Sequence, residues 1–228
     1  EEYGLGRLVV VADKGLNCGD NIAYQIASGN GYIYSQSIRG ADREFKQFVL
    51  DQSGYQPMGE HSKCKSRIYP REITFTDSHG KKQKLRVDQK QIVFFSQDYA
   101  DKARYERNRT IAKAQSFLKF PSSLARSLSY TAASYIKGIQ INEDGEIVNT
   151  NTKLYLDMDK IREEEQYDGY YSIVTSELDC NDSEIIEILT NPGRDRWPQH
   201  WQCAIISYGS KFRPQEHGNC HGVILLER

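Results

Sequence analysis

The sequence lacks any apolar run near the roughly 20 residues that cross a bilayer, and no charged-then-apolar leader opens it. Cysteine is sparse too. The five cysteines are an odd number, are scattered and include no Cys-x2-Cys pair, which argues against a disulfide framework. No internal repeat is present. We therefore expect a cytoplasmic globular protein with reduced thiols.

The remaining composition is ordinary for a folded protein, with 228 residues, 38% hydrophobic and 27% charged. This length suffices for one large domain or two small ones. The net charge of -1 hides an asymmetry, because residues 61–126 hold 16 Lys and Arg against 6 Asp and Glu, whereas residues 137–188 hold 4 against 14. The basic segment either follows a phosphate backbone or pairs with the acidic segment, and the sequence favours neither.

The stretch 7–17 is an apolar, β-branched run closed by Asp13 and a turn. Such a run predicts a buried strand, with Asp13 at its carboxyl end. Ligands bind at that edge of open α/β sheets, so Asp13 is a candidate metal ligand. The alternative is ordinary turn chemistry, in which Asp bonds to the backbone and Gly15 accepts unusual geometry.

The pattern after this strand predicts a helix over 20–26 and a strand over 32–38, which make a βαβ unit with a parallel sheet. Proline at 192 ends the last predicted helix. The other expected elements, in chain order, are a helix over 41–50, a loop over 51–65, strands over 68–76 and 83–96 joined by a hairpin turn, a basic helix over 98–120, short strands within 136–156, a helix over 157–165, a strand over 168–175 and a helix over 181–188.

Four stretches in this order carry a resemblance to a known family. They are 10–17 (Val-Val-Ala-Asp-Lys-Gly-Leu-Asn), 31–40, 167–176 and the helix start 182–188. Together they resemble the central part of DDE transposases of bacterial insertion sequences, over roughly residues 5–188. The resemblance implies an α/β fold, a partial RNase H-like core interrupted by a mostly β insertion with one long basic helix. The implied parts are a core part over 1–50, a β-rich insertion with the long helix over 51–166, a return to the core over 167–188 and an aberrant, irregular tail over 189–228.

The resemblance also implies the chemistry of the family. Such enzymes hold two divalent metals, usually Mg²⁺, with three carboxylates that act in cleavage and strand transfer at transposon ends. Asp13 matches the second carboxylate, in the family's Asp-Lys/Arg-Gly motif. The first belongs to a strand upstream of Glu1, and the third has no counterpart after Ile188, where the sequence departs abruptly, as a frameshifted reading frame would.

We therefore expect an incomplete transposase chain that is inactive alone, with DNA, itself or the full-length transposase as partners. The alternative is a non-catalytic DNA-binding or subunit-interaction fragment. Asp13 is the one expected catalytic and metal-ligating residue. The candidate nucleic-acid contacts are Lys63, Lys65, Arg67, Lys81, Lys82, Lys84, Arg104, Arg107, Arg109 and Lys113. A solvated surface explains these cations equally well.

The tail has a second pattern, made of the residue types of a small zinc site. A Cys-x2-Cys pair is missing from it, and an out-of-frame tail supplies such residues by chance. The residues are His200, Cys203, His217, Cys220 and His221.

Overall fold

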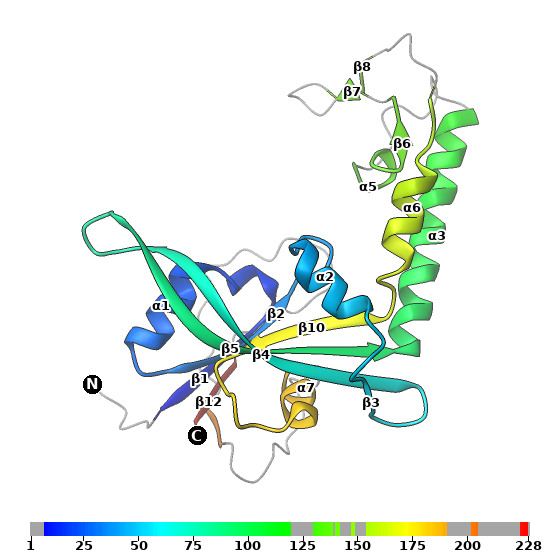
Figure 1. Ribbon diagram of the computed structural model, residues 1–228. Helices are drawn as coiled ribbons and strands as arrows, with labels where there is room; N and C mark the ends of the chain where they lie inside the picture. Colours follow the sequence, from blue (N-terminus) through cyan, green and yellow to red (C-terminus); the bar gives the residue numbers. More distant parts are fainter. Residues whose placement is uncertain are drawn as a thin grey trace. The chain divides into compact units, whose positions relative to one another are not determined.

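The computed structural model describes residues 7–119, 130–138, 140–141, 147–148, 154–190, 202–204 and 224–227. The fold is mixed α/β, as the sequence predicts (Figure 1). The chain forms two compact units, residues 1–94 with 171–228, and residues 95–170. Among the described helices, none is long and apolar enough to cross a bilayer.

The main sheet is built around two parallel strands, β1 (Leu8–Ala12) and β2 (Gly31–Gln36), with Val10 opposite Tyr32. Helix α1 (Gly19–Ala27) connects them, which confirms the predicted parallel βαβ unit. The strand order is β11-β12-β1-β2-β10-β5-β4-β3. The remaining strands are β3 (Gln56–Pro57), β4 (Ser62–Thr76), β5 (Lys82–Ser96), β10 (Tyr170–Thr175), β11 (Gln202–Ala204) and β12 (Ile224–Glu227).

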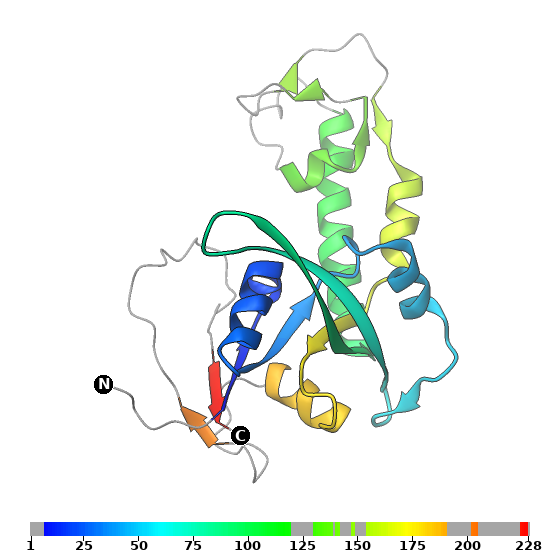
Figure 2. The ribbon, with the colours of Figure 1, turned by 60° about the vertical axis from the view of Figure 1, so that its left-hand side comes forward.

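Alternation along β1 divides its side chains between two hydrophobic clusters. Val9 and Val11 pack with helix α7 (Asp182–Thr190), whereas Val10 and Ala12 pack with α1. Both faces of β1 are therefore covered, which explains why its run is continuously apolar rather than alternating. Figure 2 shows α1 and α7 beside these central strands.

Strand β12 pairs antiparallel with β1 on the side away from β2, with Val10 opposite Leu225. Strand β11 pairs in turn with β12. The segment predicted to be an irregular tail thus contributes two short strands to the sheet. Its other residues beyond Thr190 lie outside the described part.

Helix α2 (Arg43–Leu50) begins at Asp42, whose Oδ1 accepts a hydrogen bond from the Phe45 amide at 2.7 Å. Cationic side chains of β4 lie against aromatic rings of α2 and of the loop that follows it. The Lys65 Nζ lies 4.4 Å from the ring centroids of both Phe48 and Tyr55, and the Arg67 guanidinium lies 4.3 Å from that of Phe48. These contacts fix α2 and its following loop to β4.

Strands β4 and β5 form a ribbon longer than the sequence predicts. Strand β4 begins at Ser62, inside the predicted loop over 51–65. The predicted turn is present: Asp77 Oδ1 accepts hydrogen bonds from the amides of His79 and Lys81, and Gly80 has φ 76°. The polar, basic residues of 62–65 hid this strand extension, because Lys65 is covered by Phe48 and Tyr55 and Cys64 packs into the main hydrophobic cluster.

The second unit contains α3 (Gln97–Lys119), α5 (Tyr130–Ala133) and α6 (Met158–Glu165). Its hydrophobic core includes Phe117, Tyr135 and Ile161. The short strands β6 (Ile136–Lys137) and β9 (Tyr155–Leu156) pair with each other, as do β7 (Gln140–Ile141) and β8 (Ile147–Val148). This unit holds the predicted long basic helix.

Candidate functional site

Asp13 lies at the carboxyl end of β1, as the sequence predicts. It caps a 3-10 turn (η1, Lys14–Leu16), and its Oδ1 accepts a hydrogen bond from the Gly15 amide at 2.8 Å. A Cβ at Gly15 would lie 3.1 Å from that same oxygen, which explains a glycine here. The turn interpretation is therefore correct for Oδ1. It is compatible with a metal-ligand role, because a carboxylate has several lone pairs.

Asn17 holds the turn after Asp13 against two other strands, β2 and β4. Its Nδ2 donates to the Ser35 carbonyl at 3.2 Å, near the carboxyl end of β2. Its Oδ1 accepts from the Arg71 Nη1 of β4 at 3.0 Å. Hydrogen bonds to the sheet thus hold the backbone that carries Asp13 in place.

The described residues do not assemble a complete metal centre around Asp13. No group of three or more His, Cys, Asp or Glu side chains suited to a metal occurs among them. Helix α7 ends at Thr190, and the residues that follow lie outside the described part. A two-metal site needs several hard oxygen ligands, so these residues do not fit it, and we derive no metal-dependent step for them.

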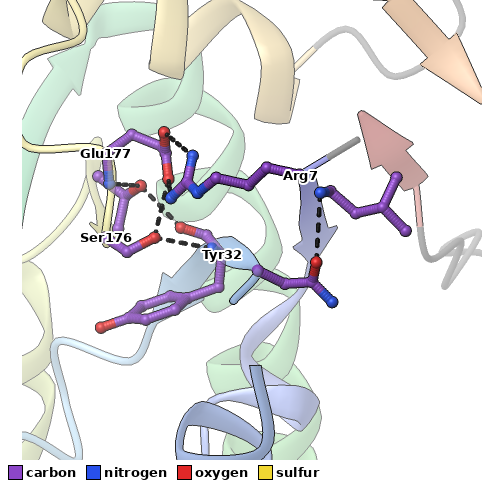
Figure 3. A network of polar contacts seen from close by, with 7 residues as sticks. Arg7, Tyr32, Ser176 and Glu177 are labelled. Atoms are coloured by element: carbon purple, nitrogen blue, oxygen red, sulfur yellow. Dashed lines mark hydrogen bonds and ion pairs between the residues drawn. The ribbon is translucent and has the colours of Figure 1, made fainter. Parts of the chain in front are cut away.

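A second polar cluster, which the sequence does not predict, lies at the amino ends of β1 and β2 (Figure 3). Both Nη atoms of Arg7 donate to the carboxylate of Glu177, at 2.8 and 2.5 Å. Ser176 Oγ donates to the same carboxylate at 2.9 Å and accepts from the Tyr32 amide at 2.9 Å. A Cβ at Gly31 would lie 2.2 Å from Glu177 Oε1.

This arrangement is charge-balanced within the chain. The Glu177 side chain has no exposed surface, whereas 39% of the Arg7 side chain is exposed. A bidentate guanidinium is the geometry that best satisfies a buried carboxylate. The cluster therefore links the start of β1 to the segment between β10 and α7, and it holds no acceptor aimed at a ligand.

The predicted nucleic-acid contacts on β4 are largely engaged within the protein. Lys65 is 5% exposed, its Nζ donates to the Asp51 carbonyl at 2.5 Å, and burial lowers its pKa. Arg67 donates to Gln91 at 2.8 Å and pairs with Glu44. Lys63 donates to Gln52 at 2.5 Å. To contact a phosphate, these side chains would have to give up hydrogen bonds and ion pairs that they form within the protein.

Arg107 requires a correction to its predicted role. Its side chain is 4% exposed and forms ion pairs with Asp168 and Glu165. It lies on the inner face of α3, seven residues from both Ala100 and Ala114, which are buried too. This seven-residue spacing is the sequence feature that indicates the burial of Arg107, since residues seven apart share a helix face. Arg107 is a structural residue, unavailable to DNA.

The other predicted cations are at the surface. Lys81 and Lys82 lie at the tip of the β4–β5 ribbon, and Lys84 pairs with Glu72 at 2.7 Å. On α3, Arg109 and Lys113 are exposed, and Arg104 pairs with Asp101 at 3.4 Å. The sequence-predicted set is thus scattered over three elements rather than brought into one site. The His and Cys side chains of the tail pattern lie outside the described part.

Comparison of the chain with protein-family models, with curated proteins and with solved structures finds no significant match.

Proposed function

We propose that this chain is a fragment of a DDE transposase, whose class function is DNA binding and metal-dependent DNA cleavage and strand transfer. One observation carries the proposal: the carboxylate of the Asp-Lys-Gly stretch lies at the carboxyl end of a buried strand that is parallel to its neighbour. This is the edge where α/β sheets bind ligands.

The strand and helix arrangement supports an RNase H-like core in this proposal. Strand β10 pairs antiparallel with β2 and leads into α7, which packs against β1 and β2. Residues 95–170 form a separate compact unit between β5 and β10, as an insertion in such a core would.

In this proposal Asp13 would supply one hard oxygen ligand to a divalent ion in the intact transposase, and the remaining ligands would come from residues that the described part of this chain does not provide. The described residues of this chain supply no further acidic cluster. We therefore propose that the chain alone binds DNA without cutting it. Its own residues act by holding the Asp13 turn rigid through Gly15 and Asn17.

A second candidate is a non-catalytic DNA-binding or subunit-interaction fragment, with a full-length transposase as partner. The exposed cations of α3 favour this candidate, because they do not depend on Asp13. The first proposal and the DNA-binding form of the second agree on DNA binding and differ in whether Asp13 binds a divalent ion.

Asp13→Asn separates the two candidates, with Asp88→Asn as the control, since Asp88 is an exposed aspartate within strand β5 and away from the Asp13 turn. The probe is Mn²⁺, a paramagnetic substitute for Mg²⁺, added to the isotope-labelled chain. We expect Mn²⁺ to broaden the amide signals of residues 13–17 in the unchanged chain and in Asp88→Asn, but not in Asp13→Asn. Equal broadening in all three proteins would refute the metal role.

DNA binding and cleavage are measured in parallel on a mixed-sequence linear duplex, with and without Mg²⁺. We expect binding at low salt and no cleaved product. Cleavage that Asp13→Asn abolishes would contradict the predicted inactivity, and a failure to bind at low salt would remove both DNA proposals.

A further inference from the structure

Helix α3 has a clearly defined outer face. Three of its four buried residues, Ala100, Arg107 and Ala114, follow one another at intervals of seven and so lie on one side, and the fourth, Phe117, flanks that side. Successive residues turn by about 100° in a helix of 3.6 residues per turn. The opposite side is therefore centred near positions 98, 105, 109 and 116.

The outer face carries three cations in one row, Lys102, Arg109 and Lys113, at intervals of seven and four residues. All three are exposed. Tyr105 lies between them, is 64% exposed, and has the Arg109 guanidinium 5.9 Å from its ring centroid. We name these four residues the outer stripe.

The cations of the outer stripe differ from the other predicted basic residues. Within the described part of the chain, none of the three belongs to an ion pair, whereas Arg104 pairs with Asp101 and Arg107 is buried between acids. Two exposed acids, Asp98 and Glu106, lie on the same side of the helix, and among the described residues no ion pair joins either of them to the row. The outer side therefore keeps an excess of positive charge, with three cations against two acids. The described residues of the acidic segment pair with Arg107 on the inner face of this helix, but with none of the three cations of the stripe.

We propose that the outer stripe binds the phosphate backbone of duplex DNA. This inference rests on the proposed function and adds Lys102 and Tyr105 to the residues predicted from the sequence. At 1.5 Å rise per residue the cations span about 16 Å, a length along which a duplex presents phosphates on both strands. The helix is narrow enough to lie in or along the major groove, which is about 12 Å wide.

The chemistry favours a polyanion over an apolar partner. The positions around the row are Asp98, Glu106, Asn108, Ala112 and Ser116, so the face has no large aliphatic side chain for a lipid surface. Arg109 is preorganised by Tyr105, which lowers the entropy lost when the guanidinium binds phosphate. Contacts of this kind position a protein on DNA without reading its sequence.

The test compares two triple variants of the full chain. The stripe variant is Lys102→Gln, Arg109→Gln and Lys113→Gln. The control variant, Lys119→Gln, Lys137→Gln and Arg162→Gln, removes the same charge from partly or fully exposed positions of the same unit, off the stripe. Glutamine is a good helix former, and circular dichroism melts verify that both variants fold.

Binding to a fluorescent mixed-sequence duplex is measured by anisotropy over a range of salt concentrations. Three lost phosphate contacts are expected to reduce the slope of log K against log salt by about 2.7 in the stripe variant. The control variant is expected to keep the slope of the unchanged chain. The charge-keeping exchange Lys102→Arg, Arg109→Lys and Lys113→Arg is expected to restore the slope.

Each other result contradicts a specific claim. If the unchanged chain binds and the stripe variant keeps its slope, the stripe inference is wrong and the proposed function stands. Equal losses in both triple variants would show a general charge effect and also overturn the stripe. If polyglutamate displaces the duplex at equal charge concentration, the assignment to DNA is wrong. If the unchanged chain fails to bind at low salt, both the stripe and the proposed function fall.

Discussion

At the residue scale, Glu177 shows how one buried charge depends on one partner. Its side chain has no exposed surface, and its carboxylate accepts hydrogen bonds from both Nη atoms of Arg7. A buried charge that loses its partner costs more than the pair contributes, because the remaining charge stays desolvated. Arg7 is thus a stability residue at the start of β1.

We predict that Arg7→Met lowers the free energy of unfolding by about 3 kcal/mol, near the low end for a broken buried pair because Arg7 is partly exposed. Urea denaturation measures the change. The control is Lys84→Met, which breaks the exposed pair with Glu72 and is expected to cost less than about 1 kcal/mol. Similar losses in the two variants would contradict the special role of Arg7.

Two buried tyrosines predict alkaline unfolding. Burial raises the pKa of Tyr32 and the pKa of Tyr34 from 10.0 to about 12. Between these values the unfolded chain has lost both protons and the folded chain retains them, so stability falls as pH rises. The expected loss is about 1.4 kcal/mol per pH unit for each tyrosine. Tyr34→Phe should halve this slope in denaturation curves recorded from pH 10 to 12, and an unchanged slope would exclude Tyr34 as a source.

Single residues also show how far the sequence predicts the candidate site. The position of Asp13 follows from a short β-branched run, which is a local signal. The pairing of Arg107 with Asp168 joins residues 61 positions apart, and no local pattern encodes it. The outer stripe is intermediate, since the helix was predictable but its buried side needed the packing of the second unit.

At the scale of elements, α1 sits unusually close to β4. A Cβ on Gly19 would lie 2.0 Å from the backbone carbonyl oxygen of Thr74. A backbone atom cannot rotate away as a side chain can. The close approach of this helix to the ribbon therefore depends on residue 19 being a glycine, which has no Cβ.

We predict that Gly19→Ala destabilises the protein by about 1–3 kcal/mol, the usual cost of forced overpacking. This outweighs the gain of up to about 1 kcal/mol that alanine brings to a helix. Gly40→Ala is the control, since its Cβ would meet its nearest neighbour, the Ser37 Oγ, at 3.6 Å. Thermal unfolding compares the two, and a Gly19→Ala protein at least as stable as the unchanged chain would show that α1 moves without cost.

Most regular elements of the first 119 residues were predictable because hydrophobic periodicity and turn residues mark them. The strand, helix, strand opening has β-branched runs and a glycine stop, and Gly29 indeed has φ 72°. Strand β12 was not predictable, because its partner β1 is more than 200 positions away and its four residues carry no turn signal. The start of β4 was missed because lysines there are covered by aromatic rings, which composition alone does not reveal.

At the scale of the molecule, the two units have unequal cores. Among the residues that the structure describes, the unit of residues 95–170 buries one small cluster around Phe117, whereas the other unit contains two larger clusters. Small cores leave less stabilising free energy after the entropy of folding. The smaller unit should therefore open first.

We predict that Phe117→Ala speeds hydrogen exchange in α3 and α6 and leaves β1 and β2 protected. The substitution is expected to lower the free energy of unfolding of this unit by about 3–5 kcal/mol, which is a large share of the stability that a small core provides. Exchange followed by mass spectrometry resolves these segments. Ala112→Gly, an exposed substitution in the same helix, is the control for helix propensity. Equal acceleration in β1 and β2 would show that the chain unfolds as one cooperative body.

The ends of the smaller unit meet at one place. The Ser96 amide donates to the Gly169 carbonyl at 3.0 Å, and the rings of Phe95 and Tyr170 lie 5.1 Å apart. A segment whose entry and exit are neighbours can be lengthened, shortened or replaced without moving the strands that precede and follow it. The length and sequence of this unit can therefore change between these two points while the sheet stays the same.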